Sequence, residues 1–471
     1  MSLGMHSTAE KTSKKGDAAA NASRVLLLFS ALTVMTFTRV GLSHTPAALA
    51  ALAVTALVAG VALLHPIAVR DLVRLRRAEL TLIGTLLLAG LVLSAGMLAL
   101  ALANLMSPLW FTVIAVYMIL GLVAALPLAR RLSSMKWAFP LFLIAHAAAT
   151  VVFLRWSPVA IDVQVFLHDG AIAVLHGHNP YAMTFPDIYP SQLSDLFYGP
   201  GVVMDGRITY GFPYLPVSLL VAIPGKLLGD VRYSQLIAMI VTALVLRRLA
   251  SDQVGRAAAV LGVASVSAIP LLFGAWTEPT IVALLACLVL ALERRRYSFV
   301  AVFLGLFMVS KQYVVITIPI IWLIRQWLTR RVILISVGVA AVATLPFFLI
   351  DPAAFWKTIV EFQLIQPFRA DSLSLLVSSV NTFGWPPPWT YGALPLLGGG
   401  LTAIVLAFCA PRTPAAFAAA IGLTLLVTIL LSKQAFMNYY FLVSGAFLIA
   451  AVAWPTHPEP TNPPPGQIEV E

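Results

Sequence analysis

The sequence predicts an all-α protein whose helices cross a membrane many times. Of its 471 residues, 60% are hydrophobic and only 10% are charged; soluble globular proteins carry about 25% charged residues. The mean hydropathy is +0.93, and the apolar residues are gathered in runs close to the roughly 20 residues that a helix needs to cross a bilayer. A helix satisfies its own backbone hydrogen bonds in lipid. We therefore expect a polytopic helical protein with about fourteen membrane segments.

The same composition excludes several classes of protein. The net charge of +11 does not indicate a nucleic-acid partner, because an excess of Lys and Arg in a membrane protein mainly sets its orientation. Cys287 and Cys409 both lie in apolar runs, so they predict neither a disulfide nor a metal framework. No cofactor and no metal ligand set is expected, and dependence on a metal stays open.

The candidate spans fall into two groups separated by a long polar stretch. The first group is Val25–Leu42, Ala47–Val69, Leu80–Ala103, Pro108–Ala129 and Trp137–Leu154. The second group is Tyr233–Leu249, Ala257–Phe273, Thr280–Leu292, Phe299–Val309, Val314–Ile324, Val332–Ile350, Tyr391–Phe408, Pro414–Leu431 and Ala435–Trp454. We divide the chain into a disordered tail (1–24), a four-span extension (25–136), a membrane core (137–454) and a Pro-rich tail (455–471).

The basic residues predict the orientation of these spans. They fall on alternate loops, at Lys11 to Lys15, Arg70 to Arg77, Arg130 to Lys136, Arg247 to Arg256, Arg294 to Arg296, Arg325 to Arg331 and Arg412. Such loops are normally cytoplasmic. We therefore expect a multi-pass protein of the cell membrane with both termini in the cytoplasm and with Asp162–Arg232 and Asp351–Trp389 outside.

One apolar stretch, Tyr214–Leu228, is not counted as a span. Counting it would place Arg247, Arg248 and Arg294 to Arg296 outside the membrane. The stretch is short and contains two prolines, so we expect a helix that lies on the outer surface or dips into it.

The polar stretch after Trp137–Leu154 contains the first candidate site. Asp162, Asp169 and His176 are spaced by seven and lie on one face if the segment is helical. The sequence from Gly177 to Tyr181 then predicts a turn. Two carboxylates and an imidazole on one face suggest acid–base chemistry. A solvated helix face explains the same pattern, and Asp162 could simply cap the helix.

Cationic side chains mark three further places. Lys311 lies between two short apolar runs that form either a re-entrant hairpin or longer helices in a thinned membrane. A charge at depth usually marks function, although a lysine can also snorkel to the interface. Arg369 lies beside Asp371 in the second external loop, and its planar fork suits a phosphate. Lys433 precedes the last span.

The external loop resembles the first external loop of polyprenol-phosphate-dependent glycosyltransferases of the GT-C class, and is most similar to the bacterial mannosyl- and arabinosyltransferase branch. The matching residues are Asp162, Phe166, Gly170, Leu175, Gly177, Asn179, Pro180 and Tyr181. Weaker matches are Phe212–Pro216 with the apolar helix after it, Trp276–Glu278, Lys311–Tyr313, Arg369–Ser374 and Lys433–Tyr440. The resemblance covers residues 137–454.

This resemblance implies an inverting hexosyl- or pentosyltransferase at the outer face of the membrane. Its donor would be a polyprenyl-phosphate sugar, and its acceptor a lipid or glycan of the cell envelope. Asp162 is then the expected base, with Asp169 as the second candidate. The substrate-binding candidates are Lys311, Arg369, Lys433, Asn179, Tyr181, Glu278, Asp371 and His176. Neither the sugar nor the oligomeric state follows.

Two other functions fit parts of the sequence. A transporter or lipid flippase would explain Lys311 at depth, but not the long outer loops. A non-catalytic assembly factor could share the fold, since a fold does not fix a function. An enzyme should gather Asp162, Lys311, Arg369 and Lys433 around one outward-facing cavity that opens sideways to lipid.

Overall fold

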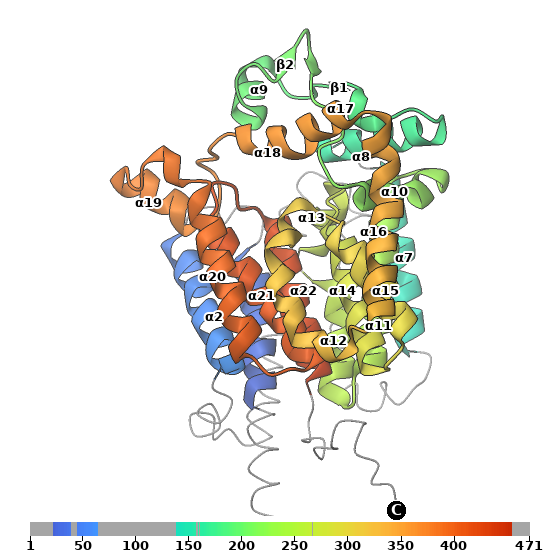
Figure 1. Cartoon of the computed structure of the whole chain (residues 1–471), viewed down its shortest axis with the longest axis vertical. Helices are drawn as coiled ribbons and strands as arrows, with labels where there is room; N and C mark the ends of the chain where they lie inside the picture. The colour runs from blue at the N-terminus through green and yellow to red at the C-terminus, as the bar shows by residue number, and fades with distance from the viewer. Residues whose placement is uncertain are drawn as a thin grey trace, which may run out of the picture.

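The computed structural model describes residues 22–38, 45–64, 138–156, 159, 161–265 and 267–454. These residues form a bundle of roughly parallel and antiparallel helices with a smaller cap at one end (Figure 1). The prediction of an all-α polytopic membrane protein is confirmed.

The bundle contains the apolar helices that the hydropathy pattern predicts. They are Ala22–Phe37, α2 (Pro46–Leu64), α7 (Ala138–Trp156), α11 (Arg232–Leu249), α12 (Gln253–Ala264), α13 (Ala268–Phe273), α14 (Glu278–Glu293), α15 (Tyr297–Met308), the 3₁₀ helix η3 (Gln312–Trp327), α16 (Arg330–Ile350), α20 (Ala393–Cys409), α21 (Pro414–Leu430) and α22 (Met437–Ala453). The predicted spans Leu80–Ala103 and Pro108–Ala129 and both predicted tails lie outside the described residues.

Length and apolarity single out a few of these helices as spans. Within the described part, α2, α16 and the stretch Pro388–Cys409, which ends in α20, are long and apolar enough to cross a membrane, and the bent pair of α10 (Pro216–Leu227) and α11 would make a fourth. Several of the remaining helices are apolar but shorter.

One predicted span proves to be two helices. Ala257–Phe273 was expected to be continuous, but the chain leaves the helix at Ser265 and forms α12 and α13. Pro270 has no N–H to donate to the carbonyl four residues earlier, so an unbroken helix would lose a backbone hydrogen bond there.

Lys311 lies at the tip of a hairpin formed by α15 and η3. Arg296 and Arg325 lie at the far ends of the two helices, while Gln312, next to Lys311, donates to the carbonyl of Pro213 in the loop before α10. A 3₁₀ helix rises about 2 Å per residue, so the 16 residues of η3 reach further than the short apolar run suggests. The hairpin therefore places Lys311 at the cap end of the bundle.

The cap is built from the two loops that the sequence predicts to be external. The first loop contributes α8 (Asp162–Leu175), η2 (Pro180–Ala182), β1 (Phe185–Pro186), α9 (Ser191–Tyr198), β2 (Val203–Met204), β3 (Arg207–Ile208) and α10. The second contributes α17 (Pro352–Trp356), the π-helical turn η4 (Lys357–Glu361), α18 (Phe362–Ile365), α19 (Leu375–Phe383) and η5 (Pro388–Thr390). The short antiparallel sheet has the order β1-β3-β2, with Phe185 and Val203 both opposite Ile208.

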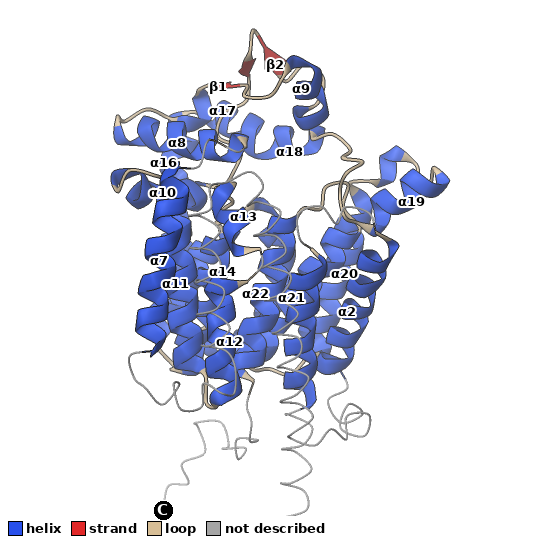
Figure 2. Cartoon of the chain, turned by 180° about the vertical axis from the view of Figure 1, so that it is seen from behind, coloured by secondary structure: helices blue, strands red, loops and turns tan. Residues whose placement is uncertain are grey.

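The helix α10 does not continue the bundle. It meets α11 at an angle of 105° and lies across the cap end in both views (Figures 1 and 2). The stretch Tyr214–Leu228 thus contains a helix that turns away from the bundle, and its place at the membrane surface stays a prediction. The cap has its own apolar core, in which Phe166, Phe185 and Phe212 are buried.

The first helices of the chain pack against the last ones. Helix α2 contacts α21, and Figure 2 shows α2 beside α20. Arg24 donates to the carbonyl of Ala451 over 2.9 Å and forms a two-pronged ion pair with Asp252, at 2.6 and 2.7 Å. The N-terminal extension is therefore tied to the core at the end opposite the cap.

Candidate functional site

Asp162 begins the first helix of the cap, α8. The preceding residue, Ile161, has extended dihedral angles and offers no side-chain cap. The Oδ1 atom of Asp162 accepts hydrogen bonds from the backbone N–H of Val163 over 2.9 Å and from the hydroxyl of Tyr189 over 3.3 Å. The carboxyl group therefore stabilises the start of the helix. It is partly buried, and its Oδ1 atom also contacts the phenol of Tyr189.

The surroundings of Asp162 favour its protonated form. Burial raises the pKa of this carboxyl group, although the phenols of Tyr198 and Tyr189, the Val163 N–H and the positive charge of Arg369 act in the opposite direction. A carboxylate with a raised pKa is a better proton acceptor near neutral pH than an ordinary aspartate.

Arg369 supplies the positive charge next to this carboxylate. Its guanidinium lies between the rings of Phe197 and Phe436, 4.5 and 4.8 Å from the two ring centroids. It also donates two hydrogen bonds to Asp371, over 2.8 and 2.7 Å. The side chain of Asp371 is 57% exposed and that of Arg369 only 13%. The guanidinium is thus enclosed by two rings and paired with a carboxylate that lies nearer the surface.

Lys311 forms a second, deeper cluster with Glu278. Glu278 begins α14 and is fully buried, and Lys311 is 5% exposed. The Oε1 atom of Glu278 accepts hydrogen bonds from Lys311 Nζ over 2.5 Å, from Asn438 Nδ2 over 2.9 Å and from the Tyr313 hydroxyl over 3.0 Å. A buried charge pair needs such additional hydrogen bonds to offset its lost hydration.

Aromatic rings surround the ammonium group of Lys311. Its Nζ atom lies 4.6 Å from the ring centroid of Tyr214, 5.7 Å from that of Tyr313 and 5.9 Å from that of Tyr439. Ring faces attract cations at these distances. The ammonium group is therefore paired with Glu278 and surrounded by three tyrosine rings. These contacts explain how a buried cation is tolerated here.

Tyr214 connects the two clusters. Burial raises the pKa of its phenol, and the negative charges of Asp162 and Glu278 raise it further, so the ring lies within electrostatic reach of both carboxylates. The preceding carbonyl, of Pro213, accepts hydrogen bonds from Gln312 over 2.8 Å and from Gln363 over 3.0 Å. The loop before α10 is thereby fixed to η3 and to α18.

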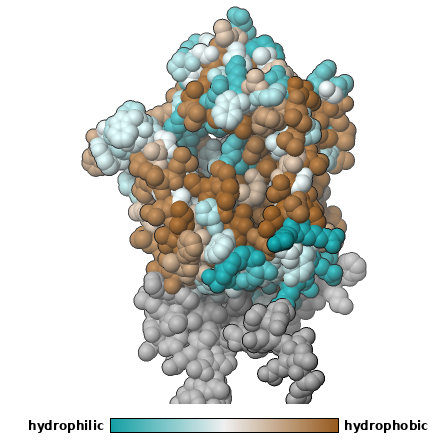
Figure 3. All heavy atoms as spheres, viewed as in Figure 1, coloured by the Kyte–Doolittle hydropathy of each residue, from teal (hydrophilic) through white to brown (hydrophobic). Residues whose placement is uncertain are grey.

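These contacts bring Asp162, Arg369 and Lys311 into one region between the cap and the bundle. Figure 3 shows that hydrophilic residues gather over the cap end of the molecule, above a largely hydrophobic flank of the bundle. The enzyme hypothesis requires four residues at one site. Three of them, Asp162, Arg369 and Lys311, lie around Tyr214, Tyr439 and the rings that enclose Arg369.

Lys433, the fourth residue, is used differently. Its ammonium group donates hydrogen bonds to the backbone carbonyls of Gln366 and Leu364, while the backbone N–H of Arg369 donates to the carbonyl of Lys433 over 3.2 Å. Burial lowers the pKa of Lys433. The lysine therefore secures the loop that carries Arg369, next to the site.

Asp169 faces a different partner from Asp162. Its Oδ1 atom lies 2.9 Å from Nδ1 of His168, whose Nε2 lies 2.6 Å from Nζ of Lys226 on α10. The three side chains form a hydrogen-bonded line that links α8 to α10. His176 does not continue the helical face as predicted, because α8 ends at Leu175. The His176 side chain is exposed and bonds the carbonyl of Ile172.

Asn179 and Tyr181 lie in the framework of the cap. Asn179 caps η2 by accepting from the N–H of Tyr181 over 3.1 Å. Tyr181 is 1% exposed, packs edge-on against Phe212, and donates its hydroxyl hydrogen bond to the carbonyl of Tyr214 over 2.8 Å. We predicted substrate contacts for both residues. In the structure Tyr181 is buried and Asn179 is partly exposed, and substrate contact stays a prediction for both.

Several residues of the site were not predicted from the sequence. Tyr189, in the segment before α9, and Tyr198, at the end of α9, lie next to Asp162, and Asn438 donates a hydrogen bond to Glu278. The sequence signal for Asn438 was a polar residue in the first turn of the last apolar span. Tyr189 and Tyr198 carry no local signal. In the described part of the chain, no group of three or more His, Cys, Asp and Glu side chains is placed to hold a metal ion.

Comparisons with known proteins add little to this picture. No protein-family model matches the chain, and no curated protein matches it. Among solved structures it is similar to ArnT from Cupriavidus metallidurans bound to undecaprenyl phosphate, with a TM-score of 0.43 and 17% sequence identity. That match covers 68% of this chain and 60% of the other. A likeness at this level does not establish a shared activity.

Proposed function

We propose that the protein is a membrane glycosyltransferase that takes a sugar from a polyprenyl-phosphate donor. The acceptor is a hydroxyl group of a lipid or glycan at the outer face of the membrane. The observation that carries the proposal is the carboxyl group of Asp162, whose pKa is raised by burial, beside an enclosed and ion-paired guanidinium, Arg369.

The reaction would be a single displacement. The carboxylate of Asp162 takes the proton of the acceptor hydroxyl as its oxygen attacks the anomeric carbon of the donor. The bond between that carbon and the phosphate oxygen breaks, its electron pair stays on the phosphate, and the configuration at the sugar is inverted. A cation placed where the negative charge develops accelerates such a step.

Arg369 is the better placed of the two cations for that phosphate. Its positive charge acts on the carboxyl group of Asp162, whose pKa it lowers, so the guanidinium lies close to the proposed base. A phosphate that leaves the sugar beside Asp162 would therefore be near this cation. Lys311 is held by the buried Glu278, so it would act mainly through its charge. Lys433 would act by holding the Arg369 loop.

A transfer assay tests the proposal. Purified protein is incubated with a panel of polyprenyl-phosphate sugars and envelope acceptors, and transferred sugar is counted. Asp162→Asn should reduce the rate by about 10²- to 10⁴-fold, the usual contribution of a positioned base. Asparagine retains the carbonyl oxygen that accepts from Val163, so the helix should start as before.

Asp169→Asn is the matched control, because it makes the same substitution two turns further along α8 and should leave most of the rate. If the Asp162 variant transfers sugar normally and the Asp169 variant does not, the base is Asp169. If no donor in the panel is used by the wild-type protein, the proposed donor class is wrong.

A further inference from the structure

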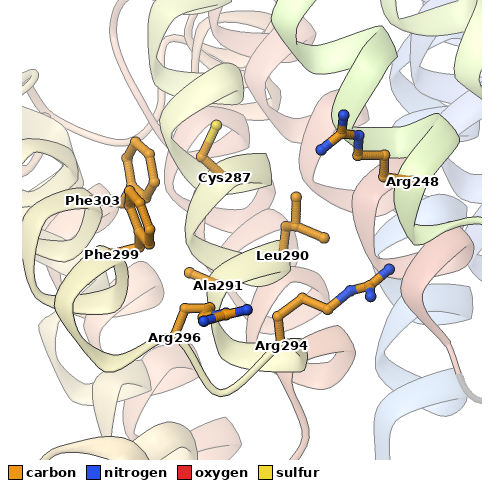
Figure 4. Close-up of a pocket in the computed structure, with 8 residues that line it drawn as sticks. All are labelled: Arg248, Cys287, Leu290, Ala291, Arg294, Arg296, Phe299 and Phe303. Carbon is orange, nitrogen blue, oxygen red and sulfur yellow. The ribbon is translucent and has the colours of Figure 1, made fainter.

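A cavity of about 670 Å³ lies at the end of the bundle opposite the cap. It is lined by Arg248, Cys287, Leu290, Ala291, Arg294, Arg296, Phe299 and Phe303 (Figure 4). These residues come from the ends of α11, α14 and α15. This is the end that the distribution of Lys and Arg predicts to be cytoplasmic, so the cavity is separate from the proposed active site.

The turn between α14 and α15 directs two arginines into this cavity. Arg295 has a φ of 51°, which is unusual for a residue with a side chain. Its N–H donates to Leu292 O over 3.0 Å, and the N–H of Arg296 donates to Ala291 O over 2.8 Å. With Arg295 in this conformation, Arg294 and Arg296 both line the cavity, and Arg295 does not.

The cavity combines positive charge with an apolar wall. None of the ion pairs formed within the described ranges involves Arg248, Arg294 or Arg296. The rings of Phe299 and Phe303 stack 6.2 Å apart on the opposite wall. An amphiphile with an anionic head and an apolar chain would satisfy both parts at once.

We infer that this cavity binds the head group and the first part of an acyl chain of an anionic phospholipid. Basic pockets between membrane helices on the cytoplasmic side are suited to anionic head groups. Arginine offers a planar fork of donors to phosphate, and the Phe299–Phe303 wall accommodates the chain. The inference is independent of the proposed transferase activity.

Native mass spectrometry of the purified protein tests the inference. The protein is exposed to equal amounts of phosphatidylglycerol and phosphatidylcholine, and bound lipids are counted. The wild type should prefer phosphatidylglycerol. The triple variant Arg248→Gln, Arg294→Gln, Arg296→Gln should lose this preference, by about fivefold for each arginine, which corresponds to the attraction of one basic residue near an anionic surface.

The matched control removes three charges from the same end of the bundle without touching the cavity. Arg330→Gln, Arg331→Gln, Arg412→Gln should keep the preference, because these residues are exposed and none lines the cavity. An equal loss in both triple variants would show a general surface effect and overturn the site. If millimolar inorganic phosphate displaces phosphatidylglycerol from the wild-type protein, the cavity is a site for free anions. That result would also overturn the inference.

A second measurement does not depend on the folding of the arginine variants. In a Cys409→Ser protein, Cys287 is the one remaining thiol, and it lines the cavity. Labelling of Cys287 by a small maleimide should be several-fold slower in phosphatidylglycerol nanodiscs than in phosphatidylcholine nanodiscs. Equal labelling rates in the two lipids would refute the inference.

Discussion

At the scale of single residues, the ionisation of Asp162 decides when the proposed reaction can run. A base must be deprotonated, so the rate falls as the pH drops through its pKa. Because burial raises the pKa of Asp162, we expect the acid limb of kcat/KM to lie above the value of about 3.9 for an ordinary aspartate. A pH profile of sugar transfer measures this limb directly.

Replacing Arg369 tests the electrostatic part of this argument. Arg369 lowers the pKa of Asp162, so Arg369→Gln should move the acid limb to higher pH, in addition to any loss of rate from weaker donor binding. Arg207→Gln serves as the control, because Arg207 is an exposed cap residue that bonds Thr184. An unmoved limb in the Arg369 variant would show that the guanidinium does not act on Asp162.

The pair of Lys311 and Glu278 leads to a residue-level prediction about stability. Removing one partner leaves a buried charge without its counterion, which costs about 3–5 kcal/mol. We therefore expect Glu278→Gln and Lys311→Met each to lower the melting temperature markedly. The double variant should recover much of the loss. Thermal unfolding in detergent gives all three values, and strictly additive losses would argue against a coupled pair.

At the scale of elements, the close contact between the loop before α10 and η2 holds the cap in place. A Cβ atom at Gly211 would lie 2.1 Å from the carbonyl oxygen of Tyr181, a backbone contact that cannot move aside. Gly211→Ala should therefore destabilise the protein by about 1–3 kcal/mol, as overpacking usually does, and should reduce transfer because Tyr214 shifts with the loop.

Gly338 in α16 gives the matched comparison. A Cβ atom there meets nothing within 4 Å, so Gly338→Ala should leave stability unchanged or raise it slightly, since alanine favours helix more than glycine does. Melting temperatures of the two variants are compared with that of the wild type. A Gly211 variant as stable as the Gly338 variant would contradict the tight packing described for the cap.

At the scale of the whole molecule, the ion pair between Arg24 and Asp252 joins the first helix to the start of α12. Burial by itself would raise the pKa of Asp252, but the hydrogen bonds and charge of Arg24 outweigh it, and the pKa is lowered. A lowered pKa in the folded state means that the pair stabilises the protein above the unfolded value, about 3.9. This contribution is lost as the pH falls through the folded-state pKa.

We expect the difference in melting temperature between the wild type and Arg24→Gln to depend on pH. The melting temperature of Arg24→Gln should be lower than that of the wild type at pH 7, and the gap should narrow below about pH 4 as Asp252 is protonated in both. Melting curves across this range measure the gap. A gap that widens on acidification would mean that Asp252 does not contribute through its charge.

The positions of the membrane helices could be predicted from the sequence because hydropathy is a local property. The predicted segments within the described residues coincide with helices, apart from the break at Ser265. The alternation of basic loops also predicted which loops gather at one end, since the cap is built from Asp162–Arg232 and Asp351–Trp389. Asp162 stood out because it is the first carboxylate after an apolar segment.

Only the tertiary structure decided which polar groups meet. The sequence by itself determined the helices, their alternation and the candidate base, because each depends on neighbouring residues. The contact of Lys311 with Glu278 joins residues 33 apart, and that of Arg24 with Asp252 joins residues 228 apart. Such pairs follow from how the helices pack, which no local pattern encodes. For the same reason Tyr181, expected at the substrate, lies in the aromatic core of the cap.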